Sequence, residues 1–191
     1  MAKLVVSEFV SLDGVMEDPG GAEGYKHGGW TFQFDRGAEG NRFKLDELFA
    51  SNALLLGRVT YQGFAQAWPG RTDEEGFAKK MNSMRKYVVS TTLTDDEATW
   101  DNTEVIRGDI PAEIARLKAE PGGDILAAGS CSLVHTLMEL GLVDEYRLMV
   151  FPIVLGSGKR LFPDTSEAAR LVLTDCGTAG DGILLLTYRA R

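Results

Sequence analysis

Hydrophobic residues follow two alternating patterns along the chain: short apolar runs of strand length, and longer stretches with helical spacing. The short runs predict strands, because β-branched or wholly apolar runs of this length suit a buried sheet. They occupy residues 3–10, 53–56, 87–89, 104–107, 125–128, 144–155, 169–174 and 182–189. The helical spacing predicts helices over residues 37–50, 61–68, 74–83, 109–119 and about 130–141.

The order of these elements predicts the fold class. Strands separated by crossover helices favour a parallel sheet, with each crossover right-handed. The last two strands are joined by a Gly-rich turn at residues 179–182, which favours an antiparallel hairpin. We therefore expect a single three-layer α/β domain over residues 1–191, with a mixed, mostly parallel central sheet.

Composition and charge narrow the classes of partner. The chain has 20 Lys and Arg against 28 Asp and Glu, a net charge of −8. This acidic balance argues against nucleic acid and anionic membrane surfaces as partners, because both attract basic proteins. No apolar run approaches the roughly 18 residues that span a bilayer, and the N-terminal stretch predicts a strand rather than a signal peptide. We expect a cytoplasmic protein with Cys131 and Cys176 reduced and no metal site.

Small, hydroxylated and basic residues follow four of the predicted strands. Gly57 and Arg58 follow one, Ser90 the next, Arg107 the third and Gly129 the fourth. Each signal is weak alone, because Gly after a strand is ordinarily a turn and Ser or Thr ordinarily a helix cap. Together they predict a split site for a phosphorylated ligand, because the carboxyl ends of parallel strands line the ligand crevice and helix starts bind anions.

A long Gly-rich loop over residues 17–36 contains an unusual number of aromatic side chains. Loops of this length in compact domains are commonly functional. Trp30 and Phe32 either stack on a substrate ring or pin the loop to the core. Phe151 either lines the wall of the substrate pocket or packs beside an edge-strand proline. Asp13 either assists proton transfer or forms a plain Asp-Gly turn, and His27 is a second candidate proton source.

Several motifs together resemble a known family. They are Leu54-Leu55-Leu56-Gly57-Arg58-Val59-Thr60-Tyr61, Val10-Ser11-Leu12-Asp13-Gly14, Ala128-Gly129-Ser130, Gly141-Leu142-Val143-Asp144-Glu145 and Pro152-Ile153-Val154-Leu155-Gly156-Ser157-Gly158. The chain resembles dihydrofolate reductase-like proteins. It is most similar to the reductase (C-terminal) domain of bifunctional riboflavin biosynthesis enzymes and its stand-alone bacterial relatives.

This resemblance implies an NADPH-dependent reductase. The helix starts at Gly57 and Gly129 would bind the pyrophosphate, and Arg58 with the hydroxyls after the next strand would bind the 2′-phosphate. The nicotinamide would lie near the end of the first strand. The expected cofactor-binding residues are Val10, Met16, Gly57, Arg58, Val59, Thr60, Ser90, Thr91, Thr92, Arg107, Gly129, Ser130 and Leu133.

The substrate expected from the resemblance is a pteridine, a pyrimidine or a related heterocycle, bound near Trp30, Phe32 and Phe151. Dihydrofolate reductases carry a pterin-contacting acid about sixteen residues before the Gly, and here Asn41 stands at that position. Glu39 and Asp46 are the nearest acids, so Glu39 joins Asp13 as a candidate catalytic residue. The zinc-binding His/Cys pattern of the fused deaminase has no match.

Three functions therefore remain open: reduction of a pteridine or pyrimidine, reduction of the riboflavin-pathway aminopyrimidine 5-amino-6-(5-phosphoribosylamino)uracil, and ligand binding without turnover. The phosphate of the riboflavin intermediate would need basic residues, for which Lys26, Lys159 and Arg160 are available. We also expect a homodimer, as in relatives, formed through the strand at residues 146–155 and the Gly-rich loop after it. The role of residues 156–158 stays open.

Overall fold

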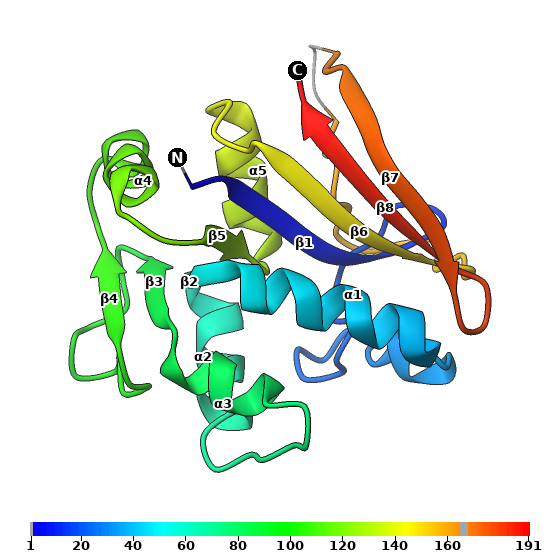
Figure 1. Ribbon diagram of the computed structural model, residues 1–191, viewed down its shortest axis with the longest axis horizontal. Helices are drawn as coiled ribbons and strands as arrows, with labels where there is room; N and C mark the ends of the chain where they lie inside the picture. The colour runs from blue at the N-terminus through cyan, green and yellow to red at the C-terminus, as the bar shows by residue number, and fades with distance from the viewer. Residues whose placement is uncertain (1, 165–167) are drawn as a thin grey trace.

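The computed structural model describes residues 2–164 and 168–191, and its strands form one eight-stranded sheet with the order β4-β3-β2-β5-β1-β6-β8-β7 (Figure 1). Strands β1 to β6 run parallel, whereas β8 pairs antiparallel with β6 and β7 pairs antiparallel with β8. The strands are β1 (Leu4–Ser11), β2 (Ser51–Gly57), β3 (Arg85–Val89), β4 (Thr103–Ile106), β5 (Asp124–Ala127), β6 (Glu145–Phe151), β7 (Leu171–Ala179) and β8 (Ile183–Ala190). This confirms the predicted mixed α/β fold.

Helices cover both faces of the sheet, as expected for parallel strands with apolar residues on both sides. The helices are η1 (Trp30–Gln33), α1 (Gly37–Ala50), α2 (Arg58–Ala67), α3 (Phe77–Ser83), α4 (Ile110–Ala119) and α5 (Cys131–Glu139). Figure 1 shows α4 and α5 above the strands and α1, α2 and α3 below them.

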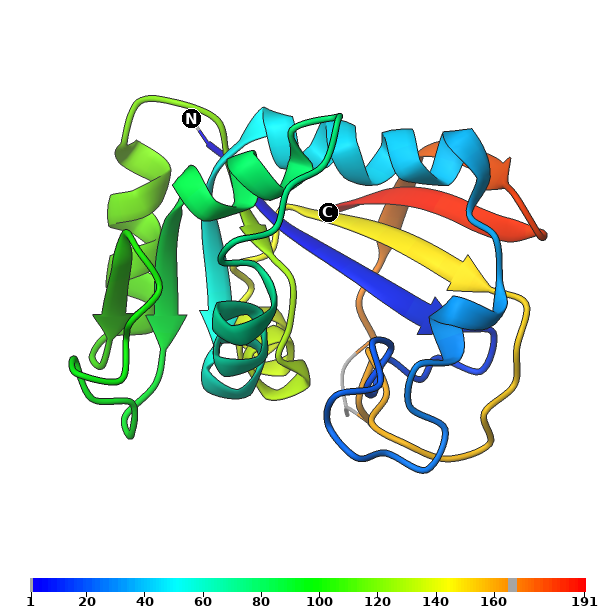
Figure 2. The ribbon, with the colours of Figure 1, turned by 90° about the horizontal axis from the view of Figure 1, so that it is seen from below.

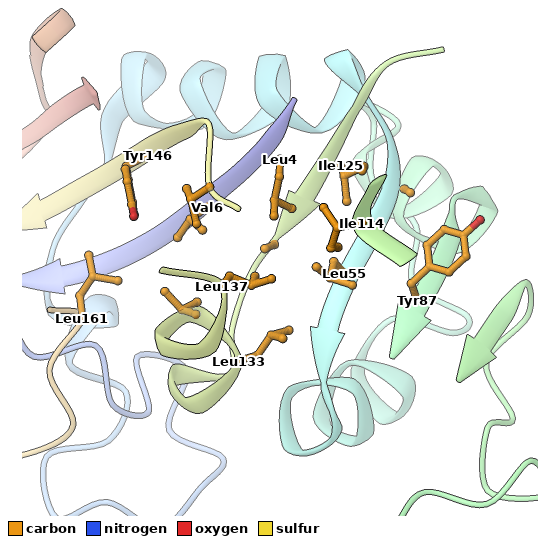
Figure 3. Packing of buried hydrophobic residues seen from close by; sticks show 14 of the residues in the cluster. Leu4, Val6, Leu55, Tyr87, Ile114, Ile125, Leu133, Leu137, Tyr146 and Leu161 are labelled. Atoms are coloured by element: carbon orange, nitrogen blue, oxygen red, sulfur yellow. The ribbon is translucent and has the colours of Figure 1, made fainter. Parts of the chain in front are cut away.

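The residues of β2 show why both faces are filled. Ala53 and Leu55 face the core beneath α4 and α5, while Leu54 and Leu56 face the core beneath α1, α2 and α3. Figure 3 shows the first of these cores, with Leu133 and Leu137 of α5 lying against the sheet. A third cluster, around Trp30 and Phe151, fills the space beneath the long loop.

Several predicted boundaries were wrong. The strand predicted over residues 169–174 is β7, which extends to Ala179. The strand predicted over residues 144–155, with an interruption at Pro152, ends altogether at Phe151. Pro152 has no N–H for a ladder, and the Ile153 N–H donates back to the Phe151 carbonyl. The helix predicted from residue 74 begins at Phe77, because the Asp73 carboxylate accepts the backbone N–H groups of Phe77 and Ala78. The preceding residues therefore form a turn that ends at Gly76.

Strands β1 and β5 separate halfway along the sheet. Their pairing ends at Val6 and Ala127, whereas β1 stays paired with β6 as far as Ser11. Figure 2 shows β1 and β6 turning away from β2 and β3 beyond this point. The chain leaves β5 at this position and enters α5 through Gly129.

Candidate functional site

A groove of about 370 Å³ lies at the carboxyl ends of β2, β3 and β4, beside the starts of α2 and α5. Its lining includes most of the residues predicted to bind a phosphorylated ligand. The lining residues are Gly57, Arg58, Val59, Val89, Ser90, Thr91, Thr92, Ile106, Arg107, Gly108, Ile110, Ser130, Ser132, Leu133 and Thr136. A second hollow, of about 430 Å³, lies at the opposite ends of the strands, away from the end where α/β sheets bind ligands.

The starts of α2 and α5 meet at a contact that only glycine permits. The Gly57 N–H donates to the Gly129 carbonyl at 3.2 Å. A Cβ on Gly57 would collide with the Ser130 side chain, and Gly129 has a positive φ of 82°. The two helix N-termini are therefore held side by side at one wall of the groove.

Neither helix N-terminus is capped by a side chain. The N-cap residues are Gly57 for α2 and Ser130 for α5, and no side-chain oxygen accepts a first-turn N–H in either helix. The Ser130 hydroxyl instead lies 3.1 Å from the Ser132 hydroxyl. Free N–H groups and the positive ends of two helix dipoles favour an anion at this wall.

Two arginines flank the groove and differ in how they are held. Arg58 is exposed and donates to the Gln62 side chain at 3.2 Å. Arg107 donates to the Leu93 carbonyl and to the Asp95 carboxylate, both at 2.8 Å. Hydrogen bonds to the turn after β3 therefore fix the Arg107 side chain, whereas the Arg58 side chain is free to rotate toward a ligand.

The Ser90 hydroxyl shapes that turn. It accepts the backbone N–H groups of Thr92 and Leu93 at 3.1 and 2.9 Å. Thr91 and Thr92 remain exposed at the groove edge. The sequence pattern thus located the turn correctly, and the structure adds a local role for Ser90.

The family model of the RibD C-terminal domain matches residues 2–185. The chain belongs to this family. Family membership places it among reductase-like proteins of the riboflavin biosynthesis type, which is the resemblance expected from its motifs.

Individual proteins are similar to this chain in sequence or in structure. The chain is 34% identical to the Bacillus subtilis (strain 168) protein YyaP over 148 residues, covering 75% of this chain and 76% of YyaP. A putative riboflavin biosynthesis protein from Shewanella sp. PV-4 has a similar structure, with a TM-score of 0.78, 20% identity and 99% of both chains covered. RibD from Acinetobacter baumannii matches with a TM-score of 0.66 and 18% identity, over 100% of this chain and 58% of that one.

The remaining predicted cofactor residues of this RibD-family chain lie outside the groove or beneath it. Thr60 is close to Gly129, where a Cβ would lie 2.8 Å from its hydroxyl. Val10 and Met16 are buried in the core at the far end of β1 and do not line the groove. Contact between these two residues and a cofactor stays a prediction.

The aromatic residues assigned to the substrate divide into two kinds. Trp30 and Phe151 are fully buried and pack edge-to-face at 5.3 Å, and the Trp30 indole donates to the Glu17 carbonyl. Core packing already accounts for both rings. Phe32 is 79% exposed and offers a free ring face, so it remains the aromatic residue of this loop best placed to meet a ligand.

The two acids proposed as catalytic have surroundings that bear on proton transfer. Burial works to raise the pKa of Asp13, but hydrogen bonds from Ser11, Leu155 and Gly156 outweigh it and lower the pKa to about 2. An acid ionised at neutral pH suits positioning better than proton donation. Glu39 is exposed in the first turn of α1, close to Gly37 where the chain meets the β7–β8 turn. Catalysis by either residue stays a prediction.

Sequence reasoning missed two buried acids that each have a carboxyl oxygen without a hydrogen-bond partner among the described residues. Glu47 on α1 accepts a hydrogen bond from Ser7 at 2.7 Å and pairs with Lys44, while its Oε2 has no partner among the described residues. Glu8 on β1 is 8% exposed, and its Oε1 likewise has no partner there. A signal was present in the sequence, because Glu8 is the one charged residue of β1.

Within residues 2–164 and 168–191, no group of His, Cys, Asp and Glu side chains is arranged to hold a metal ion. None of the helices in those ranges combines the length and apolarity needed to cross a membrane.

Proposed function

We propose that this protein is an NADPH-dependent oxidoreductase that transfers hydride to a small heterocycle. The observation that carries the proposal is the groove between two uncapped helix starts, with an exposed arginine at its edge. A dinucleotide needs a pyrophosphate site and, for NADPH, a cation near the adenosine ribose.

The residues present fit this cofactor. The first N–H groups of α2 and α5 would hold the pyrophosphate, and the missing side chain at Gly57 keeps the two helix starts close together. Arg58 would bind the 2′-phosphate with the exposed hydroxyls of Thr91 and Thr92, because a guanidinium forms strong charge-assisted bonds to phosphate. When bound, NADPH supplies the hydride.

The separated half of β1 would form the substrate side. Beyond Val6 the β5-facing edge of β1 lacks its strand partner, and the long loop with Phe32 lies at the same end of the molecule. The fixed carboxylate of Asp13 holds the loop after β6 against the loop after β1. These residues would orient the ring and exclude water, because the cofactor itself carries the hydride chemistry.

The riboflavin-pathway aminopyrimidine is a second candidate substrate, and membership of the RibD C-terminal domain family favours it. Its phosphate requires a cation on the substrate side. Arg160 is close to the loop after β1, since it donates to the Asp13 carbonyl at 3.0 Å. Lys159 faces Glu17 at 3.5 Å. Arg160 is therefore the basic residue best placed for that role.

Fluorescence titration with NADPH and NADH tests the proposal. We expect saturable NADPH binding and much weaker NADH binding, followed by NADPH oxidation with one member of a panel of dihydropterins and aminopyrimidines. Absence of binding by either nucleotide would overturn the reductase function. NADPH binding without turnover of any heterocycle would instead support a ligand-binding protein on the reductase scaffold.

A further inference from the structure

Glu8 occupies a position that packing does not explain. It lies on the face of β1 that also carries Val6 and Val10, both of which belong to the core beneath α5. The side chain is 8% exposed, and its Oε1 finds no hydrogen-bond partner among the described residues. A buried carboxyl without a full set of partners is costly, and an apolar residue at the same position would avoid that cost.

The carboxyl of Glu8 lies where β1 and β5 separate. Pairing of these strands ends at Val6 and Ala127, and the backbone N–H of Gly129 lies against the Glu8 carboxyl. The carbonyl of the same Gly129 accepts the Gly57 N–H at the wall of the groove. Glu8 therefore stands directly behind the wall proposed to hold the cofactor.

Charged groups approach Glu8 from several neighbouring elements. From α1, Lys44 attracts its carboxylate form and Glu47 repels it, and Glu23 of the long loop repels it as well. From α5, the Cys131 thiol is close enough to be influenced by its charge. Burial is the largest influence and raises the pKa of Glu8 to about 8, against the opposing effects of Lys44 and the Gly129 N–H.

A carboxylic acid that keeps its proton at neutral pH offers one O–H donor beside one carbonyl acceptor. This pair matches the edge of a heterocycle that carries an acceptor nitrogen or oxygen beside an N–H, as amide-like and amidine-like rings do. Enzymes also bury catalytic carboxyls. Burial raises the pKa of the acid, which then keeps a proton that it is able to donate near pH 7.

We propose that Glu8 carries the proton of the substrate subsite, binding the donor–acceptor edge of a ring and protonating a ring nitrogen during reduction. This inference rests on the proposed reductase function. In the step, the π bond of a C=N group would break, the carbon would take the hydride that bound NADPH supplies, and Glu8 would give its proton to the nitrogen. After release of the oxidised cofactor, the Glu8 carboxylate would recover a proton from solvent.

Infrared difference spectroscopy of wild type against Glu8→Gln tests the protonation without requiring turnover. At neutral pH we expect the carbonyl stretch of a protonated carboxylic acid in wild type, absent from Glu8→Gln and lost as the pH rises past about 8. Glu47→Gln is the matched control, because Glu47 is a buried acid that already pairs with Lys44. A wild-type spectrum without this band at neutral pH would overturn the proposal.

Binding of a basic diaminopyrimidine in the presence of NADP⁺ tests the role in the subsite. We expect the probe to take the Glu8 proton, removing the carboxylic acid band, and Glu8→Gln to weaken probe binding about 30-fold, as loss of a charged hydrogen bond does. A structural role alone would leave probe affinity unchanged. Equal affinity of wild type and Glu8→Gln, or no probe binding to wild type, would refute the assignment.

The two proposals fail differently. If wild type binds neither nicotinamide nucleotide, the reductase function fails. The infrared band of the Glu8 carboxyl in the ligand-free protein still reports whether Glu8 is protonated. If NADPH binds normally to Glu8→Gln and the pH profile of NADPH oxidation is unchanged, the Glu8 role fails and the reductase function stands. We expect the variant to bind NADPH as wild type does and to lose about 100-fold or more in kcat.

Discussion

The carboxylate of Asp13 accepts the backbone N–H of Gly156 at 2.8 Å, joining two loops that are 143 residues apart in the chain. The other carboxylate oxygen accepts the Ser11 hydroxyl at 2.7 Å and the Leu155 N–H at 3.1 Å. Ser11 also accepts the Val15 N–H. One ionised side chain thus fastens the loop after β6 to the end of β1.

Replacing this carboxylate should weaken the fold in a pH-dependent way. The pKa of Asp13 is lowered from 3.8 to about 2, so its stabilisation is present above pH 3.8 and lost as the pH falls through about 2. We expect Asp13→Asn to lower the free energy of unfolding by about 1–2 kcal/mol at neutral pH. The difference from wild type should shrink in acid, as measured by urea unfolding at several pH values. The control, Asp175→Asn, alters an exposed carboxylate on β7 and should show neither effect.

Arg58→Ala should reduce affinity for NADPH and leave affinity for NADH unchanged. The removed guanidinium would lose its charge-assisted bonds to the 2′-phosphate, which are worth about 2 kcal/mol or roughly 30-fold in Kd. Fluorescence titration measures both affinities. Arg42→Ala removes an exposed arginine of α1 that does not line the groove, and it should bind both nucleotides as wild type does. An equal loss for NADPH and NADH in Arg58→Ala would contradict the assignment.

Gly57→Ala should damage both stability and the groove. The added Cβ would collide with the Ser130 side chain and lie 3.1 Å from the Ser130 backbone nitrogen. Overpacking of this kind costs about 1–3 kcal/mol, and separation of the helix starts should weaken NADPH binding. Ser130→Gly in the same chain removes the side-chain collision and should restore part of the stability. The control is Gly63→Ala within α2, where an added Cβ meets nothing within 4 Å. This substitution should raise the free energy of unfolding, because Ala has a higher helix propensity than Gly.

Glu8 should make stability fall with rising pH. Its pKa is raised from 4.5 to about 8 in the folded protein, so the cost of ionising Glu8 in the fold is absent below pH 4.5 and grows as the pH rises toward about 8. Glu8→Leu should therefore raise the free energy of unfolding above pH 8 by about 1–3 kcal/mol, because it removes a buried, incompletely partnered carboxyl. Thermal and urea unfolding provide the measurement. A destabilised Glu8→Leu with unchanged pH dependence would show that Glu8 is structural.

The homodimer surface expected from the sequence, over residues 146–155 and the loop after them, is exposed only in part. Strand β6 lies between β1 and β8 with Leu148 and Phe151 buried, whereas Val154 is 67% exposed. Strand β7 is a free edge of the sheet, and its Leu173 is 48% exposed. We propose association of two copies through β7, because an edge strand with apolar side chains favours pairing. Sedimentation should show a dimer that Leu173→Lys converts to monomer, and a monomeric wild type would refute this.

Local patterns were enough to predict most elements and the groove. Hydrophobic periodicity located the strands and helices, because each element must place its apolar residues toward a core wherever that element lies in the fold. The order of parallel strands then placed Gly57, Ser90, Arg107 and Gly129 at one edge of the sheet. The sequence marked Pro152 as an interruption of the strand predicted over residues 144–155, but it did not show that the strand ends there, since the apolar pattern continues to Leu155.

The environment of each polar group was decided by the tertiary structure. The sequence offered Asp13 and Glu39 as acids, yet the fold gives Asp13 three hydrogen bonds and leaves Glu39 in solvent. Glu8 is the one charged residue of β1, and it acquires its raised pKa only when the fold buries it beside Gly129. The sequence by itself determined the fold and the groove, because backbone order and hydrophobicity are local or sequential properties. Charge state depends on burial and on neighbours far along the chain, which only the folded arrangement brings together.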